Sequence, residues 1–496
     1  MAKKSKALIR KGSNAFSDEG ITRVTVEGYK SLITSQSIDI KPITVLAGAN
    51  SSGKSSILQP LLLLKQTLDA SYDPGALLLD GPNVRFTSAR QFLSKRNVAE
   101  QTDSFKVAIH VGPTASLEAV FGREGEQPIS ITNMTFVEGE EKLSIKTDMS
   151  DSEIRQSLSD EQKSFAETVE KFEKSPVTYF VKRNRCFLEV AFRVQKDNQD
   201  ILFMLGPIGK NIDRHIRRII HLPGLRGNPE RTYPVTAVGS EFPGTFEKYV
   251  ASVIAQWQNS NEDTLRDLNK DLTELGLTWK VLAKRVNETQ VALEVGRIQH
   301  ETERGTHDLV SIADVGFGVS QVLPVIVALH AARPSQIVFL EQPEIHLHPK
   351  AQHAMAKVIA RAAKRGVRVV IETHSALTLL GLQTMVATGE VQPEIVALHW
   401  FKRAPDGSST VTTASEIGVR SCNPIPSRPS SPPWPALSAS NTPAPSIMSP
   451  AAAMPDRTSS RTIATEGPSC LSWHTSLIDS AGAAMPIASW VITIIC

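Results

Sequence analysis

The chain contains a repeated unit in which a short apolar run ends in polar residues and a helix-forming segment follows. Residues 43–47, 337–340 and 368–371 are predominantly apolar runs with the length of buried strands. The second run is followed by a helical segment that extends to about Lys364. Strands that alternate with helices in this way are typical of an α/β fold.

Other patterns occupy the middle of the chain. Residues 104–140 and 178–206 alternate apolar and polar side chains, which predicts strands. Residues 150–175 predict one or two solvated helices, and they lack the sustained heptads of a long coiled coil. Residues 211–221 predict an amphipathic helix with its isoleucines on one face. The remaining predictions are helices and turns over 240–285, a strand over 290–295, and a closing hairpin of 395–403 with 409–414.

The N-terminal part predicts a short meander that leads into the strand at 43–47. Residues 21–26 form its first strand and residues 38–40 its second. Residues 57–70 are helical in composition, with a row of leucines that we expect in the core. Pro60 is expected to kink this helix, because proline removes a backbone hydrogen bond.

These patterns divide the chain into five parts: a disordered basic leader (1–19), an N-terminal lobe (20–97), an inserted α+β region (98–304), a C-terminal lobe (305–414) and a tail (415–496). After Ser415 lie 12 of the 30 prolines and three of the four cysteines, but no lysine. Such a segment cannot bury enough apolar surface to fold alone. The abrupt change of composition also suggests either an out-of-frame reading of the tail or a truncated family C-terminus.

Composition narrows the class of protein further. With 496 residues, 41% of them hydrophobic and 21% charged, the chain resembles an ordinary globular protein of several domains. A net charge of +3 gives no global case for binding nucleic acid, so any such surface is a local patch. Four cysteines without a C-x-x-C pair fit a reducing compartment. The basic start lacks the apolar core of a signal peptide, and Pro486 breaks the last apolar run, so we expect a cytoplasmic protein outside the membrane.

The strongest chemical signal is the sequence GANSSGKS, which fits the spacing G-x-x-x-x-G-K-S in full. Its two glycines allow a tight turn and a close approach to phosphate. The loop N–H groups and the start of the next helix can then face the β-phosphate. Lys54 can reach the β- and γ-phosphates, and the Ser55 hydroxyl can hold Mg²⁺. We therefore predict an ATP and Mg²⁺ site here.

Four motifs stand in a particular order: GANSSGKSS, DVGFGVSQVLPV, FLEQPEIHLHP and IETHS. In this order they resemble the ABC-class ATPase heads of the SMC, RecF and OLD (overcoming lysogenization defect) groups. The chain is most similar to the stand-alone bacterial AAA-family ATPases of that branch, many of which lie in DNA-repair or phage-defence loci. The resemblance covers about residues 21–414 and implies a P-loop NTPase with an ABC-type, two-lobed head.

The resemblance assigns roles to residues of this sequence. It implies that the nucleotide loop consists of Gly48, Ala49, Asn50, Ser51, Ser52, Gly53, Lys54, Ser55 and Ser56. The signature turn, which in such enzymes contacts the nucleotide of a second subunit, corresponds to Gly316, Gly318, Ser320 and Gln321. Here that turn lacks the usual S-G-G order. Such a contact between subunits implies a head-to-tail homodimer.

The same resemblance places the acidic and histidine groups. Glu341 corresponds to the metal-orienting acid of the Walker B strand, and His374 to the switch histidine that senses the γ-phosphate. Where the family has a water-activating glutamate, this chain has Gln342, so Glu344 and Glu372 are the nearest alternative acids. An amide cannot act as a general base, although it can orient water.

Three further groups have two interpretations each. Gln91, 37 positions after Lys54, lies where a second metal- or water-contacting loop falls in ABC-type ATPases, but it also fits a plain surface residue. His346 and His348 fit the loop that crosses to the partner subunit better than a zinc site, because no third ligand lies nearby. An arginine row could be a solvated helix face or a DNA contact, and it consists of Arg214, Arg217 and Arg218, with Arg226 and Arg231 beyond it.

The expected function is that of a dimerising, Mg²⁺-dependent ATPase that couples its nucleotide state to DNA or to a separate effector protein. DNA repair or antiviral defence is the implied setting. The alternative is an ATP-sensing scaffold that hydrolyses little, and Gln342 is its main support. A transporter subunit is disfavoured, because roughly 200 residues are inserted between the phosphate loop and the signature-like turn.

Overall fold

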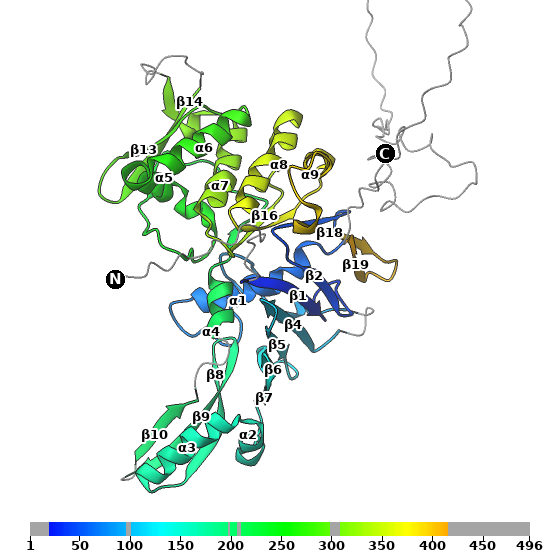
Figure 1. Cartoon of the computed structure of the whole chain (residues 1–496), viewed down its shortest axis with the longest axis vertical. Helices are drawn as coiled ribbons and strands as arrows, with labels where there is room; N and C mark the ends of the chain where they lie inside the picture. The colour runs from blue at the N-terminus through cyan, green and yellow to red at the C-terminus, as the bar shows by residue number, and fades with distance from the viewer. Residues whose placement is uncertain (1–18, 96–100, 197–198, 206–209, 298–307, 415–496) are drawn as a thin grey trace, which may run out of the picture. The chain divides into compact units, whose positions relative to one another are not determined.

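Figure 1 shows the protein as a computed structural model that describes residues 19–95, 101–196, 199–205, 210–297 and 308–414. All of these residues belong to one compact unit, Met1–Ile417. The predictions of a disordered leader before residue 19 and of a tail from residue 415 lie outside the described residues.

A six-stranded sheet carries the repeated strand–helix units. Its order is β11 (Ile220–Leu222), β16 (Ile337–Glu341), β17 (Arg368–Glu372), β3 (Ile43–Gly48), β18 (Val396–Arg403) and β19 (Ser409–Ala414). The first five strands are parallel, and only β19 runs antiparallel, to β18. The three predicted apolar strands are thus confirmed as adjacent members of one parallel sheet, and the hairpin of β18 with β19 is confirmed too.

This sheet separates two hydrophobic cores. Because side chains alternate along a strand, Phe339 and Val370 face one core, while Val338 and Val369 face the other. Both faces are therefore buried, which explains why these strands are continuously apolar rather than alternating.

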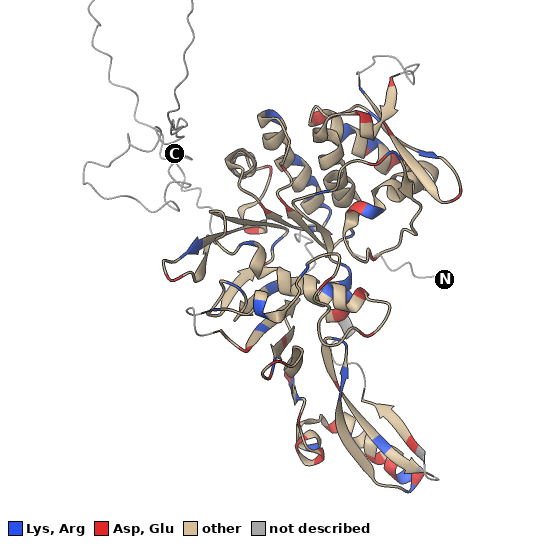
Figure 2. Cartoon of the chain, turned by 180° about the vertical axis from the view of Figure 1, so that it is seen from behind, with Lys and Arg blue, Asp and Glu red and all other residues tan. Residues whose placement is uncertain are grey.

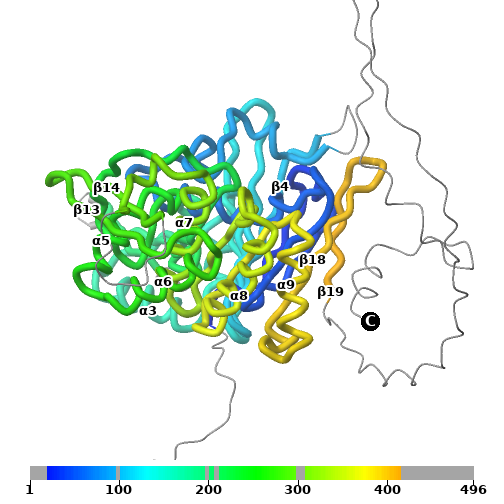
Figure 3. Tube along the Cα trace, turned by 90° about the horizontal axis from the view of Figure 1, so that it is seen from above, coloured from blue at the N-terminus to red at the C-terminus, as the bar shows by residue number. Residues whose placement is uncertain are grey.

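Five helices form the core on one face of the sheet: α5 (Val250–Ser260), α6 (Glu262–Glu274), α7 (Phe317–Ala331), α8 (Pro349–Lys364) and α9 (Ala376–Ala387). Figure 3 shows α8 and α9 side by side, in agreement with their contacts. Residues 240–285 also supply β13 (Val281–Arg285), which pairs with β14 (Gln290–Gly296), the predicted strand. Beside β14 lie β12 (Tyr233–Pro234) and β15 (Leu309–Ser311).

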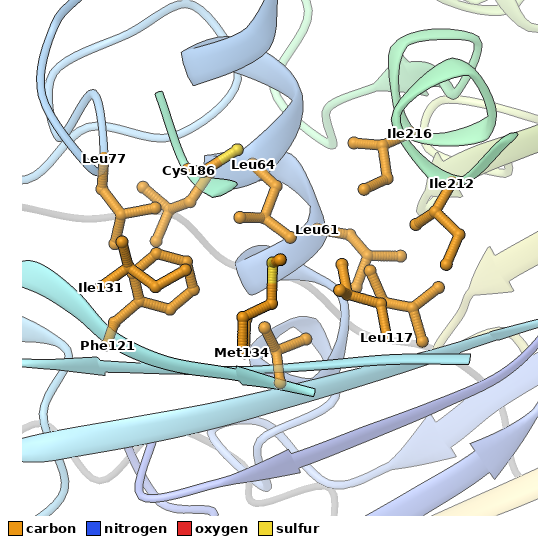
Figure 4. Close-up of a cluster of buried hydrophobic side chains, with 14 of the residues drawn as sticks. Leu61, Leu64, Leu77, Leu117, Phe121, Ile131, Met134, Cys186, Ile212 and Ile216 are labelled. Atoms are coloured by element: carbon orange, nitrogen blue, oxygen red, sulfur yellow. The ribbon is translucent and has the colours of Figure 1, made fainter. Parts of the chain in front are cut away.

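Helix α1 (Gln59–Asp69) lies on the other face, and its leucines enter the core as predicted. They pack against a second sheet, whose order is β2 (Gln36–Asp39), β1 (Ile21–Glu27), β4 (Ser104–Val111), β5 (Ala115–Gly122), β6 (Ser130–Glu138) and β7 (Glu141–Lys146). Figure 4 shows Leu61 and Leu64 in this cluster with Met134, and with Ile216 of α4 (Lys210–Arg217). The second sheet includes strands on both sides of residue 97, and the proposed lobe boundary there cuts through it.

A third sheet, β10 (Gln199–Met204), β9 (Phe187–Lys196) and β8 (Val177–Asn184), packs beside β6 and β7. It is accompanied by α2 (Asp151–Ser157) and α3 (Asp160–Glu173), which confirm the helices predicted over 150–175. Ser150 and Ser159 each complete a capping box, which fixes the two helix starts. Acidic and basic residues are mixed along this part of the chain (Figure 2).

Two helix predictions are wrong in their bounds. The segment after the phosphate loop forms a short 3₁₀ turn, Ser55–Ile57, and α1 begins only at Gln59. Pro60 therefore occupies the first turn of α1, where its missing N–H costs nothing, and it starts the helix instead of kinking it. The helix predicted over 211–221 ends at Arg217, because the next residues enter β11 and pair with β16.

Four further 3₁₀ turns complete the described elements: Ala89–Gln91, Phe246–Tyr249, Ile312–Asp314 and Pro393–Ile395. Within the described part of the chain, no helix combines the length and the apolar character needed to cross a bilayer.

Candidate functional site

The phosphate loop follows β3 and is shaped by its two glycines. Gly48 (φ +146°) and Gly53 (φ +93°) adopt backbone conformations that side chains rarely allow. A Cβ on Gly48 would lie 2.4 Å from the Phe401 carbonyl oxygen, and one on Gly53 would lie 2.7 Å from the Ser31 hydroxyl oxygen. Only glycine fits either position, so this loop geometry depends on both.

Lys54 spans the mouth of this loop. Its Nζ donates hydrogen bonds to the carbonyl oxygens of Gly48 (3.1 Å) and Ala49 (2.8 Å), and the residue is only 3% exposed. Burial lowers the pKa of the Lys54 ammonium, and the Glu372 charge opposes this shift. A cation that rests on two neutral carbonyls is ready to exchange them for phosphate oxygens.

The strand register brings two acids to the edge of the sheet beside this loop. Glu341 ends β16 and Glu372 ends β17, and the two residues are direct partners in the parallel ladder. The Ser55 hydroxyl donates a 2.7 Å hydrogen bond to the Glu372 carboxylate. Burial raises the pKa of Glu372, and the Glu341 charge adds to this, while the Ser55 hydrogen bond acts against it.

The Glu341 carboxylate is held by His221 and Gly224, two residues for which the sequence analysis predicted no role at the site. His221 Nε2 lies 3.2 Å from one carboxylate oxygen, and the Gly224 N–H donates to the other at 3.1 Å. Burial works to raise the pKa of Glu341, but the hydrogen bonds from His221 and Gly224 outweigh it, so the pKa lies below its usual value. The sequence IHLPG, residues 220–224, could have indicated a short strand and a turn here. The helical spacing of the isoleucines over 211–221 concealed that pattern.

Gln342, which stands where the family has its water-activating glutamate, and the nearby acid Glu344 differ in their surroundings. Gln342 has a left-handed backbone (φ +46°), and its N–H donates to the Glu372 carbonyl at 2.7 Å. Glu344 is buried, and one of its carboxylate oxygens accepts hydrogen bonds from the Thr373 hydroxyl and from the N–H groups of His374 and Ser375. Glu344 therefore joins the loop after β16 to the turn after β17.

The three predicted histidines lie on loops at this edge. His374 is exposed, and its pKa is lowered by partial burial and by the Lys54 charge. His348 caps the start of α8, and the His346 ring lies 6.0 Å from that of Phe317. Among the residues that the structure describes, no group of three or more His, Cys, Asp or Glu side chains is placed to hold a metal ion by itself.

The predicted signature turn is the first part of α7 rather than a separate turn. Gly316 precedes the helix, and Gly318, Ser320 and Gln321 lie inside it. Ser320 is buried and donates to the Phe317 carbonyl, while the Gln321 amide donates to the Gly227 carbonyl. The exposed residues here are Gly316 and Phe317, of which Phe317 is 55% exposed.

A cavity of about 910 Å³ opens over the phosphate loop. Basic residues outnumber acidic ones in its lining: Lys30, Lys54, Arg90, Lys95 and Arg403 against Glu372 and Asp406. Gln91 lies in this wall, but its side-chain amide is bonded to Thr87. A metal contact of Gln91 therefore stays a prediction.

The predicted arginine row is divided among several contacts. Arg217 donates to the Leu68 carbonyl, and Arg231 pairs with Asp314. Arg226 is buried and donates to the carbonyls of Gln321 and Glu341, so it joins α7 to β16. Arg214 lies on α4, but Arg218 follows its end, so the five arginines do not share one helix face.

The residues present fit a nucleoside triphosphate with Mg²⁺. The loop glycines leave space where a Cβ would clash, and Ser52 Oγ is buried without a partner among the described residues. Ser55 and Glu341 could supply oxygen ligands, which Mg²⁺ prefers, and Glu372 lies beside both of them. Because Mg²⁺ in phosphate sites takes most other ligands from phosphate and water, one carboxylate and a hydroxyl would suffice from the protein.

Residues 43–380 match the family model described as "AAA domain, putative AbiEii toxin, Type IV TA system". This match covers more than half of the chain. The chain belongs to this AAA family. The predicted resemblance to AAA-family ATPases and the α/β fold class are thereby confirmed. No curated protein gave a match.

Solved structures with some similarity include three SMC heads. One is an SMC head bound to the C-terminal winged-helix domain of ScpA (11% identity, TM-score 0.44), with coverage of 79% of this chain and 97% of that one. Another is the SMC head domain from Thermotoga maritima (10%, TM-score 0.36; 79% and 98%). The third is a Pyrococcus furiosus SMC head with an extended coiled coil, bound to the C-terminal domain of ScpA (10%, TM-score 0.40; 79% and 96%).

Replacement of Lys54 by Ala should abolish tight ATP binding, because it removes the cation that spans the phosphate loop. Titration calorimetry with ATP would measure this, with Lys402→Ala as the control, since Lys402 is an exposed lysine of β18. Unchanged affinity in Lys54→Ala would contradict the assignment of the loop.

Glu372→Gln should stabilise the nucleotide-free protein at neutral pH. Since the folded state raises the pKa of Glu372, folding favours its protonated form, and the stability that this provides is lost as pH rises through the folded pKa. The melting temperature of the variant should exceed that of the wild type at pH 7.5, and the difference should shrink towards pH 4.5. A variant that melts lower than the wild type at pH 7.5 would show that Glu372 stabilises the fold.

Proposed function

We propose that this AAA protein binds ATP with Mg²⁺ over its phosphate loop and hydrolyses it to ADP and phosphate. The observation that carries this proposal is the hydrogen bond from Ser55 to Glu372, with Glu341 beside it in the ladder. In support of the proposal, one carboxylate contacts the hydroxyl that is expected to meet the metal, and a second ends the neighbouring strand. Mg²⁺ would neutralise phosphate charge there, and it would also favour the ionised forms of both acids.

Among the acids left open by the sequence, Glu372 is our choice for the carboxylate that receives a proton from the attacking water. It lines the cavity, and its burial suits a general base. Glu344 does not line this cavity, and its hydrogen bonds serve the turn at 373–375. Gln342 would orient the water, and Lys54 would stabilise charge on the phosphates.

One observation favours a second candidate, an ATP-sensing scaffold with little turnover. The residue after Glu341 is an amide, so the position that the family uses for its base carries none. Steady-state turnover of the purified wild type distinguishes the two candidates. ATP binding without measurable phosphate release would favour the scaffold.

Turnover of four variants should identify the carboxylate. Glu372→Gln and Glu341→Gln should each lower kcat by about 100-fold or more, the usual effect of losing a proton acceptor or charge partner. Glu344→Gln should act mainly on stability, and Gln342→Glu should keep or raise turnover. Loss of activity in Glu344→Gln, with Glu372→Gln still active, would move the base to Glu344.

We also propose that two copies associate head to tail when nucleotide is bound, with the start of α7 against the nucleotide of the other copy. In support, Phe317 is 55% exposed there, beside the exposed His346 of the loop after β16. An exposed aromatic side chain of this kind gains by being covered. Such a dimer would couple nucleotide state to DNA or to a separate effector, in DNA repair or antiviral defence.

Sedimentation should show a dimer with Mg²⁺ and a non-hydrolysable ATP analogue, and a monomer without them. Phe317→Asp should prevent the dimer, because it places a charge at the proposed contact. Phe172→Asp is the control, since Phe172 is an exposed aromatic residue of α3 in the third sheet region. A monomer under all conditions, or a dimer unaffected by Phe317→Asp, would contradict this arrangement.

A further inference from the structure

His221 is fully enclosed next to the acid that ends β16. It is 1% exposed, it lies in β11, and its ring stacks on Phe339 at a centroid distance of 5.4 Å. Parallel pairing of β11 with β16 sets His221 opposite Phe339, two residues before Glu341. The backbone and the stacking partner therefore leave its ring little freedom to turn.

The other ring nitrogen of His221 has a partner that fixes the position of the proton. Asn83 Nδ2 lies 3.1 Å from His221 Nδ1 and also donates to the Gly244 carbonyl at 3.4 Å. A reversed Asn83 amide would place its oxygen against that carbonyl oxygen, so the amide nitrogen belongs on this side. Nδ1 of His221 thus accepts a hydrogen bond, and its Nε2–H donates to Glu341.

Asn83 is itself held by the helix that follows the phosphate loop. The Gln66 side-chain oxygen accepts hydrogen bonds from the N–H groups of Asn83 and Val84, at 3.1 and 3.0 Å. Gln66 belongs to α1 and is 1% exposed. A series of hydrogen bonds, from the Gln66 side chain through half-buried Asn83 to the His221 ring, therefore connects α1 with Glu341.

We propose that His221 is a positioning residue for Glu341, with its hydrogen-bonding direction set by Asn83, which Gln66 of α1 holds in place. This inference rests on the proposed function, in which Glu341 orients Mg²⁺. His221 and the Gly224 N–H each hold one carboxylate oxygen, so Glu341 is fixed before the metal arrives. Loss of a residue that holds a metal ligand in this way typically lowers metal affinity or activity by about 10- to 100-fold.

The test compares how Mg²⁺ supports binding of the ATP analogue AMP-PNP, measured by calorimetry without turnover. His221→Leu should raise the Mg²⁺ concentration for half-maximal binding about 10-fold or more, while metal-free binding in EDTA stays within about twofold. His221→Gln, which keeps a side-chain N–H donor, should recover most of the loss. Asn83→Leu should show an intermediate effect, because it frees the ring without removing it.

The control is His399→Leu, a histidine of β18 in the same sheet that is also fully buried and hydrogen-bonded on both nitrogens. It should lower the melting temperature and leave the Mg²⁺ requirement unchanged. If His221→Leu does not fold, a Mg²⁺ requirement in Asn83→Leu equal to that of the wild type overturns the inference.

Two further results separate this inference from the proposed function. Wild-type protein that fails to bind AMP-PNP would overturn both. If AMP-PNP binding needs Lys54, but wild type, His221→Leu and His221→Gln all require the same Mg²⁺ concentration, the positioning role alone would be overturned.

Discussion

The site depends on the register of three parallel strands. β16, β17 and β3 are hydrogen-bonded neighbours, so Glu341, Glu372 and the phosphate loop reach the same edge of the sheet together. A shift of one residue in β17 would turn Glu372 to the opposite face and into a core. Burial of both faces opposes such a shift, because it would exchange the apolar contacts of every residue in the strand.

A short segment, residues 220–227, completes this edge from the far side of β16. Its strand β11 supplies His221, and its loop supplies Gly224 and Arg226. Arg226 contacts both the end of β16 and α7, which carries the signature-like residues. Any movement of α7 against a second subunit would therefore reach the Glu341 backbone through one buried guanidinium. This coupling links the proposed dimer to the proposed chemistry.

The sequence was sufficient for the features that depend on local patterns. Continuous apolar runs predicted the buried strands, and glycine spacing predicted the phosphate loop, since only glycine tolerates those backbone angles. Features that depend on tertiary pairing were missed. β11 is only three residues long, and its isoleucines continue the helical period of α4, so its place beside β16 could not be seen. The relation of Glu372 to Ser55 was hidden for the same reason, because 317 residues separate them.

The helix after the phosphate loop illustrates a finer limit. Composition indicated a helix over residues 57–70, yet the loop closes with a 3₁₀ turn through Ile57, and the regular helix begins at Gln59 with Pro60 in its first turn. Proline is acceptable in a first turn and disruptive in an interior, and the sequence alone does not say which position it occupies.

A structure of the protein with Mg²⁺ and a non-hydrolysable ATP analogue would test the central claim most directly. The account predicts that Lys54 Nζ leaves the Gly48 and Ala49 carbonyls for the phosphates. It also predicts that the metal lies between Ser55 and Glu341 at the end of β16, with Glu372 free to face the attacking water. A nucleotide bound elsewhere, with Lys54 still on its own loop carbonyls, would contradict it.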